Sequence, residues 1–109
     1  MPYDEGLANR IRGALADYNK VEEKRMFGFL VFMVNGRMCL GVRGDEMMCR
    51  IGPDMMESVL RRDGCVPLRM KRKTSLNMIM VDNSGMKTKK EFDYWINLAL
   101  EFNRGRRSR

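Results

Sequence analysis

The chain has 109 residues, of which 44% are hydrophobic and 32% are charged, and its formal net charge is +7. This composition is typical of globular proteins, and the length fits a single domain with one core, which excludes disordered, fibrous and multi-domain proteins. No stretch approaches the roughly 20 uninterrupted apolar residues that cross a bilayer, and the N-terminus lacks the features of a signal peptide. We therefore expect a cytoplasmic protein without membrane contact.

An amphipathic helix is predicted over residues 4–18. Apolar side chains recur there at helical spacing, at Leu7, Ile11, Ala14, Leu15 and Tyr18. Asp4 precedes them and is a suitable N-cap, because its carboxylate can accept hydrogen bonds from free backbone amides of the first turn.

Antiparallel strands are predicted over residues 21–51, where the apolar period changes to two residues. Asn35-Gly36 is the strongest short signal of a type I′ hairpin turn. It predicts the pairs Val34–Arg37, Met33–Met38, Val31–Leu40 and Phe29–Val42. A second turn at Gly44-Asp45 predicts the pairs Arg43–Glu46, Val42–Met47 and Leu40–Cys49.

This register gives the sheet one wholly apolar face, which we assign to the core: Phe29, Val31, Met33, Met38, Leu40, Val42, Met47, Cys49 and Ile51. The opposite face also carries apolar side chains, and these are our candidate protein interface: Leu30, Phe32, Val34, Cys39 and Met48. An exposed apolar patch often marks a contact with another protein or with a second copy of the same chain. The alternative is that the last helix or a loop covers these residues.

The remaining elements are a short helix opened by Gly52-Pro53, a strand over residues 76–81, a turn over 82–85 and a final helix. Thr88 and Glu91 have the spacing of a capping box at the start of that helix, and Gly105 lies where helices commonly end. Residues 65–75 give no clear signal. The predicted fold class is α+β, with helices on one face of a mostly antiparallel sheet and the order α-β(3–4)-α-β(1–2)-α, followed from residue 104 by a flexible basic tail.

The segment Glu23-Lys24-Arg25-Met26-Phe27-Gly28-Phe29, followed by Phe32-Met33-Val34-Asn35-Gly36 and Gly52-Pro53, resembles the signature of the TfoX (Sxy) N-terminal domain family. Family members often have Met-Phe-Gly-Gly where this chain has Met26-Phe27-Gly28-Phe29. The resemblance spans nearly the whole chain, residues 1–103 forming one domain. It implies a two-layer fold like that of secretion chaperones, a role in regulating transcription or competence, and no catalytic residues.

Little in the sequence points to catalysis, metal binding or a small-molecule substrate. The chain has no histidine, which removes the commonest general base and metal ligand. Its cysteines, Cys39, Cys49 and Cys65, are too far apart in the sequence for a typical zinc site, so we expect reduced thiols, no metal and no cofactor. A redox sensor remains an alternative if Cys39 is exposed and oxidisable.

Basic residues cluster in residues 61–73 and at the C-terminus, which favours an anionic partner. The candidate nucleic-acid contacts are Arg61, Arg62, Lys71, Arg72, Lys73, Arg104, Arg106, Arg107 and Arg109. No aromatic residue lies between 61 and 75, so we expect phosphate contacts without base recognition. The alternative is a solvated face. The leading hypothesis is a non-enzymatic regulatory or protein-interaction module, and the second is a nucleic-acid-binding accessory protein.

Overall fold

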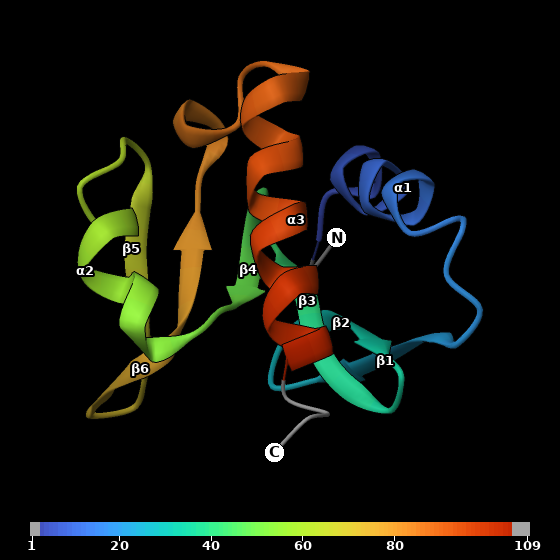
Figure 1. Ribbon diagram of the computed structural model, residues 1–109, viewed down its shortest axis with the longest axis horizontal. Coiled ribbons are helices and arrows are strands. Elements are labelled where there is room, and N and C mark those ends of the chain that lie inside the picture. Colours follow the sequence, from blue (N-terminus) through green and yellow to red (C-terminus); the bar gives the residue numbers. More distant parts are fainter. Residues whose placement is uncertain (1–2, 106–109) are drawn as a thin grey trace.

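Three α-helices lie against one face of a six-stranded antiparallel sheet in the computed structural model, which describes residues 3–105 (Figure 1). The elements are, in chain order, α1 (Glu5–Ala14), β1 (Val21–Met26), β2 (Phe29–Val34), β3 (Arg37–Arg43), β4 (Glu46–Arg50), the 3-10 helix η1 (Pro53–Met55), α2 (Met56–Val59), β5 (Cys65–Met70), β6 (Lys73–Val81), the 3-10 helix η2 (Asn83–Gly85) and α3 (Lys89–Gly105). The strands pair in the order β1-β2-β3-β4-β6-β5. The predicted fold class and order of elements are confirmed.

Side-chain caps begin α1 and α3 as the sequence predicts. The carboxylate of Asp4 accepts hydrogen bonds from the amides of Gly6 and Leu7 at 2.7 and 3.2 Å. At α3 the Thr88 hydroxyl accepts a hydrogen bond from the Glu91 amide, and the Glu91 carboxylate accepts one from the Thr88 amide, both at 3.1 Å. These two bonds complete the capping box.

The first helix ends at Ala14, four residues earlier than predicted. The chain continues in tight turns, in which the Tyr18 amide donates to the Leu15 carbonyl at 3.0 Å. Leu15 is nevertheless buried in the main core and Tyr18 packs against it, so apolar spacing alone could not distinguish these turns from a further helical turn.

A β-bulge shifts the predicted register between β2 and β3. The pairs Val34–Arg37 and Met33–Met38 form as predicted, but Phe32 then pairs with Leu40, so that Cys39 is an extra residue in β3. Beyond the bulge the predicted pairs Val31–Leu40 and Phe29–Val42 are wrong by one residue. The pairing of β3 with β4 follows the prediction.

Because of the bulge, the side chains of β2 that face the main core are not the predicted ones. The main cluster, between the sheet and the helices, contains Leu30, Phe32 and Val34 of β2. Phe29 and Val31, which we had assigned to the same face as Leu40, lie instead on the opposite face. Because both faces of β2 are apolar, the residue types did not reveal this change.

Helix α3 packs across the middle of the sheet and is held there by two buried hydrogen bonds (Figure 1). The Trp95 indole N–H donates to the Gly85 carbonyl at 2.9 Å, and the Asn103 amide donates to the Val34 carbonyl at 3.0 Å. The first bond ties α3 to the 3-10 helix η2, and the second ties its last turn to the end of β2, and both are favoured because a buried donor without a partner is costly.

The opposite face, which we call the helix-free face, has a smaller cluster of its own. Five of its side chains are at most 4% exposed and four methionines flank them: Phe29, Val31, Met48, Leu68 and Met80, with Met26, Met33, Met38 and Met78. Among the described residues, the buried apolar side chains of the helices all belong to the main cluster, and none belongs to this smaller one. The sheet is therefore apolar on both sides, and its own side chains close the helix-free face.

The connector that the sequence left unassigned forms most of a second long hairpin. Residues 65–75 contain β5, a two-residue turn at Lys71-Arg72 and the start of β6. Only residues 78–81 of β6 pair with β4, so the outer part of this hairpin extends past β4, toward the lower left in Figure 1.

Candidate functional site

The candidate interface residues are buried in the structure. Leu30, Phe32, Val34 and Cys39 lie in the main core, where helices cover the sheet, and Met48 lies inside the cluster of the helix-free face. None of the five is more than 4% exposed. The expected exposed patch is therefore absent, and the alternative of a covering helix describes the first four residues.

Large exposed apolar side chains are found instead mainly on two hairpins. Phe27, at the β1–β2 turn, is 67% exposed, and Leu76 of β6 is 77% exposed. Val66 and Met70 of β5 are also exposed. The two hairpins thus present the apolar surface that the predicted interface does not.

The β1–β2 turn has the same geometry as the Asn35-Gly36 turn. Phe27 and Gly28 have φ angles of 57° and 79°, and Asn35 and Gly36 have 54° and 79°. Sequence reasoning did not identify this turn, because phenylalanine is rare at positive φ. The glycine at its second position was the signal that could have indicated it.

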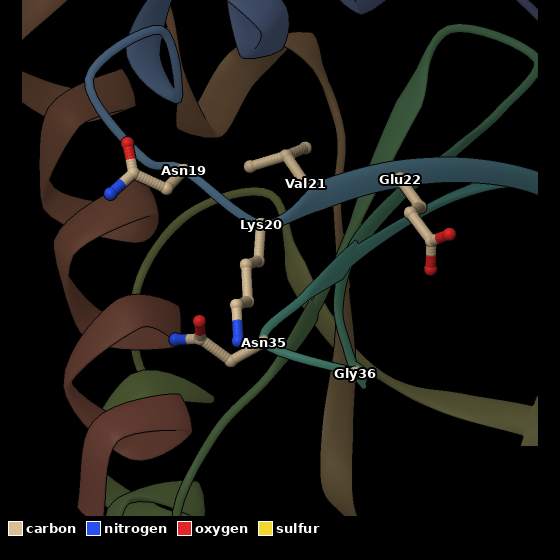
Figure 2. A pocket seen from close by; sticks show the side chains of 6 residues that line it. All are labelled: Asn19, Lys20, Val21, Glu22, Asn35 and Gly36. Carbon is tan, nitrogen blue, oxygen red and sulfur yellow. The ribbon is translucent and has the colours of Figure 1, made fainter.

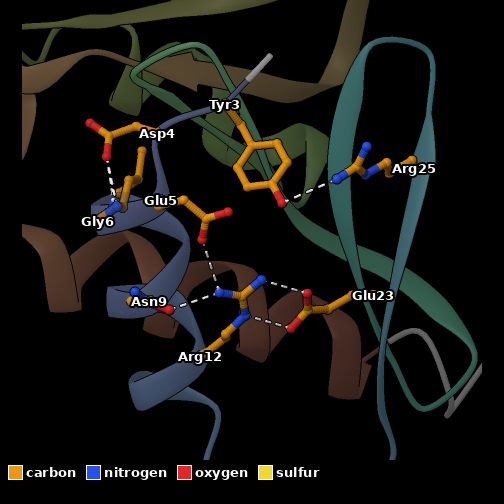
Figure 3. Close-up of polar contacts among 9 residues, drawn as sticks. Tyr3, Asp4, Glu5, Gly6, Asn9, Arg12, Glu23 and Arg25 are labelled. Atoms are coloured by element: carbon orange, nitrogen blue, oxygen red, sulfur yellow. Dashed lines mark hydrogen bonds and ion pairs between the residues drawn. The ribbon is translucent and has the colours of Figure 1, made fainter. Parts of the chain in front are cut away.

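A hollow of about 300 Å³ adjoins the Phe27 turn and contains residues from three segments. It is lined by Tyr3, Arg25, Met26, Phe27, Gly28 and Phe29. The Arg25 guanidinium lies 5.6 Å from the centre of the Tyr3 ring and donates a long hydrogen bond, 3.5 Å, to the Tyr3 hydroxyl (Figure 3). The site therefore combines apolar walls with one cationic group.

Strand β1, which leads into this turn, is fastened to α1 by an ion pair. The Arg12 guanidinium donates two hydrogen bonds to the Glu23 carboxylate at 2.7 and 2.8 Å and also approaches Glu5 at 3.5 Å (Figure 3). These contacts hold the pKa of the Glu23 carboxyl below its ordinary value and raise that of Arg12. Because β1 is an edge strand, this clamp positions the turn that follows it.

Another hollow lies where β1 begins, beside the β2–β3 turn (Figure 2). In this view the Lys20 side chain extends toward Asn35, whereas Glu22 points away. The hollow is open to solvent and is lined by Asn19, Lys20, Val21, Glu22, Asn35 and Gly36. Nothing in its arrangement indicates chemistry.

The candidate nucleic-acid contacts do not form one patch. Arg61 and Arg62 precede β5, whereas Lys71, Arg72 and Lys73 follow it, so the two groups lie at opposite ends of that strand (Figure 1). Arg104 belongs to the last turn of α3 and not to a tail. The candidates Arg106, Arg107 and Arg109 lie outside the described residues.

The two groups also differ in their contacts. The Arg62 guanidinium stacks over the Tyr94 ring at 3.9 Å and lies 5.6 Å from the Trp95 ring. Arg61 forms an exposed ion pair with Glu57 at 3.6 Å. These arginines have partners within the domain, and Arg62 in particular packs against α3.

The three cysteines are free thiols in the main core. The bulge brings Cys39 to the same side of the sheet as Cys49, although the sequence placed them on opposite faces. Burial raises the pKa of Cys39 to about 12, that of Cys65 to about 11 and that of Cys49 well above its ordinary value. A buried, protonated thiol is a poor nucleophile, which argues against the redox-sensor alternative.

Residues 3–105 contain no group of three or more His, Cys, Asp or Glu side chains that could hold a metal ion. Within the same residues, no helix has the length and hydropathy needed to span a membrane.

The family model described as the TfoX N-terminal domain matches residues 13–103. The chain belongs to the TfoX N-terminal domain family. Comparisons with curated proteins and with solved structures give no significant match. The matched range includes the Phe27 turn and both long hairpins, so these features lie within the TfoX N-terminal domain itself.

Proposed function

We propose that this TfoX N-terminal domain is a non-enzymatic regulatory module that binds a protein partner, and that Phe27 anchors the contact. Family membership supports a regulatory module of the TfoX kind. The observation that carries the proposal is Phe27 itself, a large apolar side chain held at positive φ and left 67% exposed.

The turn does not need a phenylalanine. The Asn35-Gly36 turn of the same chain adopts nearly equal φ angles with asparagine, which accepts the left-handed region. Other L-residues pay roughly 1–2 kcal/mol for it. Phe27 therefore makes the β1–β2 hairpin less stable than asparagine would.

The core does not need this phenylalanine either. Phe27 belongs to neither hydrophobic cluster, and two thirds of its surface faces solvent. A residue that strains the backbone without filling the core indicates a role outside the fold. Exposed aromatic side chains commonly provide the anchors of protein interfaces.

The neighbouring hollow suits a partner with an apolar side chain next to an acidic group. Met26 and Phe29 provide the apolar wall, and the flexible thioether can adapt to the partner's shape. Arg25 also lines the hollow, and its guanidinium can donate hydrogen bonds to a carboxylate or a backbone carbonyl. We infer that the partner inserts beside Phe27, in the cytoplasm, in a step that regulates transcription.

The absence of catalysis is part of the same proposal. It is supported by the lack of histidine in the chain and by the raised pKa values of its buried cysteines. These features remove the most common nucleophile and general base pairs.

The test compares the wild-type domain with Phe27→Asn and, as a matched control, Leu76→Asn, which removes an equally exposed apolar side chain from the other hairpin. A partner captured from an extract of the source organism is purified and titrated calorimetrically against each protein. We expect one partner molecule per domain, with binding at least 30-fold weaker for Phe27→Asn, because truncating an aromatic anchor costs roughly 2 kcal/mol. Leu76→Asn should bind as the wild type does.

Equal binding by Phe27→Asn and the wild type would refute the assignment of the site. A second copy of the domain is the competing occupant, and sedimentation equilibrium measures it directly. If the wild type dimerises and Phe27→Asn does not, the contact is between two copies of this chain and the proposed partner is wrong.

A further inference from the structure

The outer part of the β5–β6 hairpin carries only positive charge. Its cationic side chains are Arg69, Lys71, Arg72 and Lys73, and the whole segment Cys65–Val81 contains no Asp or Glu. All residues from 69 to 74 are exposed. The segment therefore has the charge pattern of a surface that meets an anion.

These cations have no acidic partner within the part of the domain that the structure describes. Among residues 3–105, none of the four makes an ion pair, whereas Arg12, Arg61 and Lys89 each have an acidic partner. Their side chains are consequently available to a ligand. Their mutual repulsion is also uncompensated, which indicates that they do not stabilise the fold.

The turn at the end of the hairpin places a lysine where the backbone is strained. Lys71 has a φ angle of 56°, in the region that glycine or asparagine occupies without cost. Its exposed side chain contributes no packing in return. As with Phe27, neither the turn geometry nor packing within the domain requires this residue type.

The hairpin is a free ribbon of two strands at this point. Pairing with β4 stops at Met78, and beyond it Arg69 pairs with Thr74 and Met70 with Lys73. A two-stranded ribbon fits the major groove of B-DNA, which is about 12 Å wide, with its cations directed at the flanking phosphates.

We propose that the outer β5–β6 hairpin binds the phosphate backbone of duplex DNA without sequence preference. A duplex is favoured over a single strand because no aromatic side chain lies between Cys65 and Val81 to stack on bases. An anionic lipid surface is disfavoured because Lys71 and Arg72 form the tip, whereas Leu76 is set back from it. Membrane-binding segments place apolar side chains deepest.

The test is fluorescence anisotropy with a labelled 25-base-pair duplex of arbitrary sequence, titrated between 25 and 200 mM NaCl. The hairpin variant replaces Lys71, Arg72 and Lys73 with glutamine. The control variant replaces Lys20, Lys87 and Lys90 with glutamine. These lysines are exposed on other segments, and both variants lose three positive charges.

We expect the wild type to bind at 50 mM NaCl, and the hairpin variant to bind at least tenfold more weakly. The slope of log K against log salt should fall by about 2.7 in the hairpin variant, since each lost phosphate contact removes about 0.9. The control variant should change affinity by less than threefold. Equal losses in both variants, or no binding by the wild type at 50 mM, would overturn the proposal.

Two further measurements locate the contact. Amide chemical shifts of the wild-type protein should move mainly in residues 69–76 when duplex is added, and shifts spread evenly over the domain would contradict a hairpin site. Vesicles containing 30% phosphatidylserine should bind more weakly than duplex. Binding to these vesicles but not to DNA would show that the ligand of the hairpin is an anionic lipid surface and that the proposed DNA contact is wrong. None of these results depends on the protein partner of Phe27.

Discussion

Replacing Phe27 with asparagine should make the domain more stable while removing the proposed binding anchor. Asparagine relieves the strain of positive φ, worth roughly 1–2 kcal/mol. The substitution also loses the buried third of the phenylalanine surface. Because full burial of such a side chain is worth about 1.5–3 kcal/mol, that third contributes roughly 0.5–1 kcal/mol.

The difference predicts a net stabilisation of about 0.5–1 kcal/mol and a Tm increase of about 2–4 °C for a domain of this size. Circular dichroism during thermal and urea unfolding measures both quantities, and an unchanged m value shows that the unfolded state is comparable. The reciprocal variant Asn35→Phe, at the turn of matching geometry, should lose about 1 kcal/mol or more. A loss above 1 kcal/mol in Phe27→Asn would refute the reasoning, because it would show that Phe27 stabilises the fold.

Two further predictions concern Gly64 and Cys39. Gly64→Ala should lower the free energy of unfolding by about 2–4 kcal/mol in urea titrations, because the new Cβ would lie 2.6 Å from the Gly85 nitrogen at a φ of 76°. Gly44→Ala, with φ of 59° but open space around it, should lose only about 1 kcal/mol, and equal losses would exclude the clash as the cause. The stability of the wild type should also fall as pH rises from about 9 to 11, because unfolded thiols ionise near pH 9 and the folded Cys39 thiol only near 12. Cys39→Ala should show a shallower fall in urea titrations, and identical slopes would contradict this source of the pH dependence.

Elements marked by specific local chemistry could be predicted from the sequence. The turns at Asn35-Gly36 and Gly44-Asp45, the Asp4 cap and the Thr88 capping box all depend on residues whose side chains or backbone preferences dictate one geometry. The predicted fold class followed from the order of these elements.

The register of β2 and the β5–β6 hairpin could not be predicted in the same way. The bulge at Cys39 changes which side chains face the helices, but Leu30 and Val31 are equally apolar, so neither register is favoured by residue type. The Lys71-Arg72 turn contains no glycine, proline or asparagine, and its strand β5 reads as a basic loop although Val66, Leu68 and Met70 alternate.

The candidate sites were missed for a related reason. Burial decides whether an apolar side chain is core or interface, and burial depends on the register. The bulge places Leu30 and Phe32 beneath the helices, so residues that we predicted as interface belong to the core. Phe27 could be recognised only once its exposure and φ angle were known.

The methionine cluster of the helix-free face gives the two sides of the sheet unequal tolerance to sequence change. On the helix side, large rigid side chains such as Trp95 and Phe32 are buried in a close-packed cluster, so a change of volume there is costly unless neighbouring residues change with it. On the other side, unbranched methionine side chains can change rotamer to fill the space left by a neighbour. Related sequences can therefore drift on the helix-free face, including at positions beside Phe27, while the helix side keeps the architecture constant.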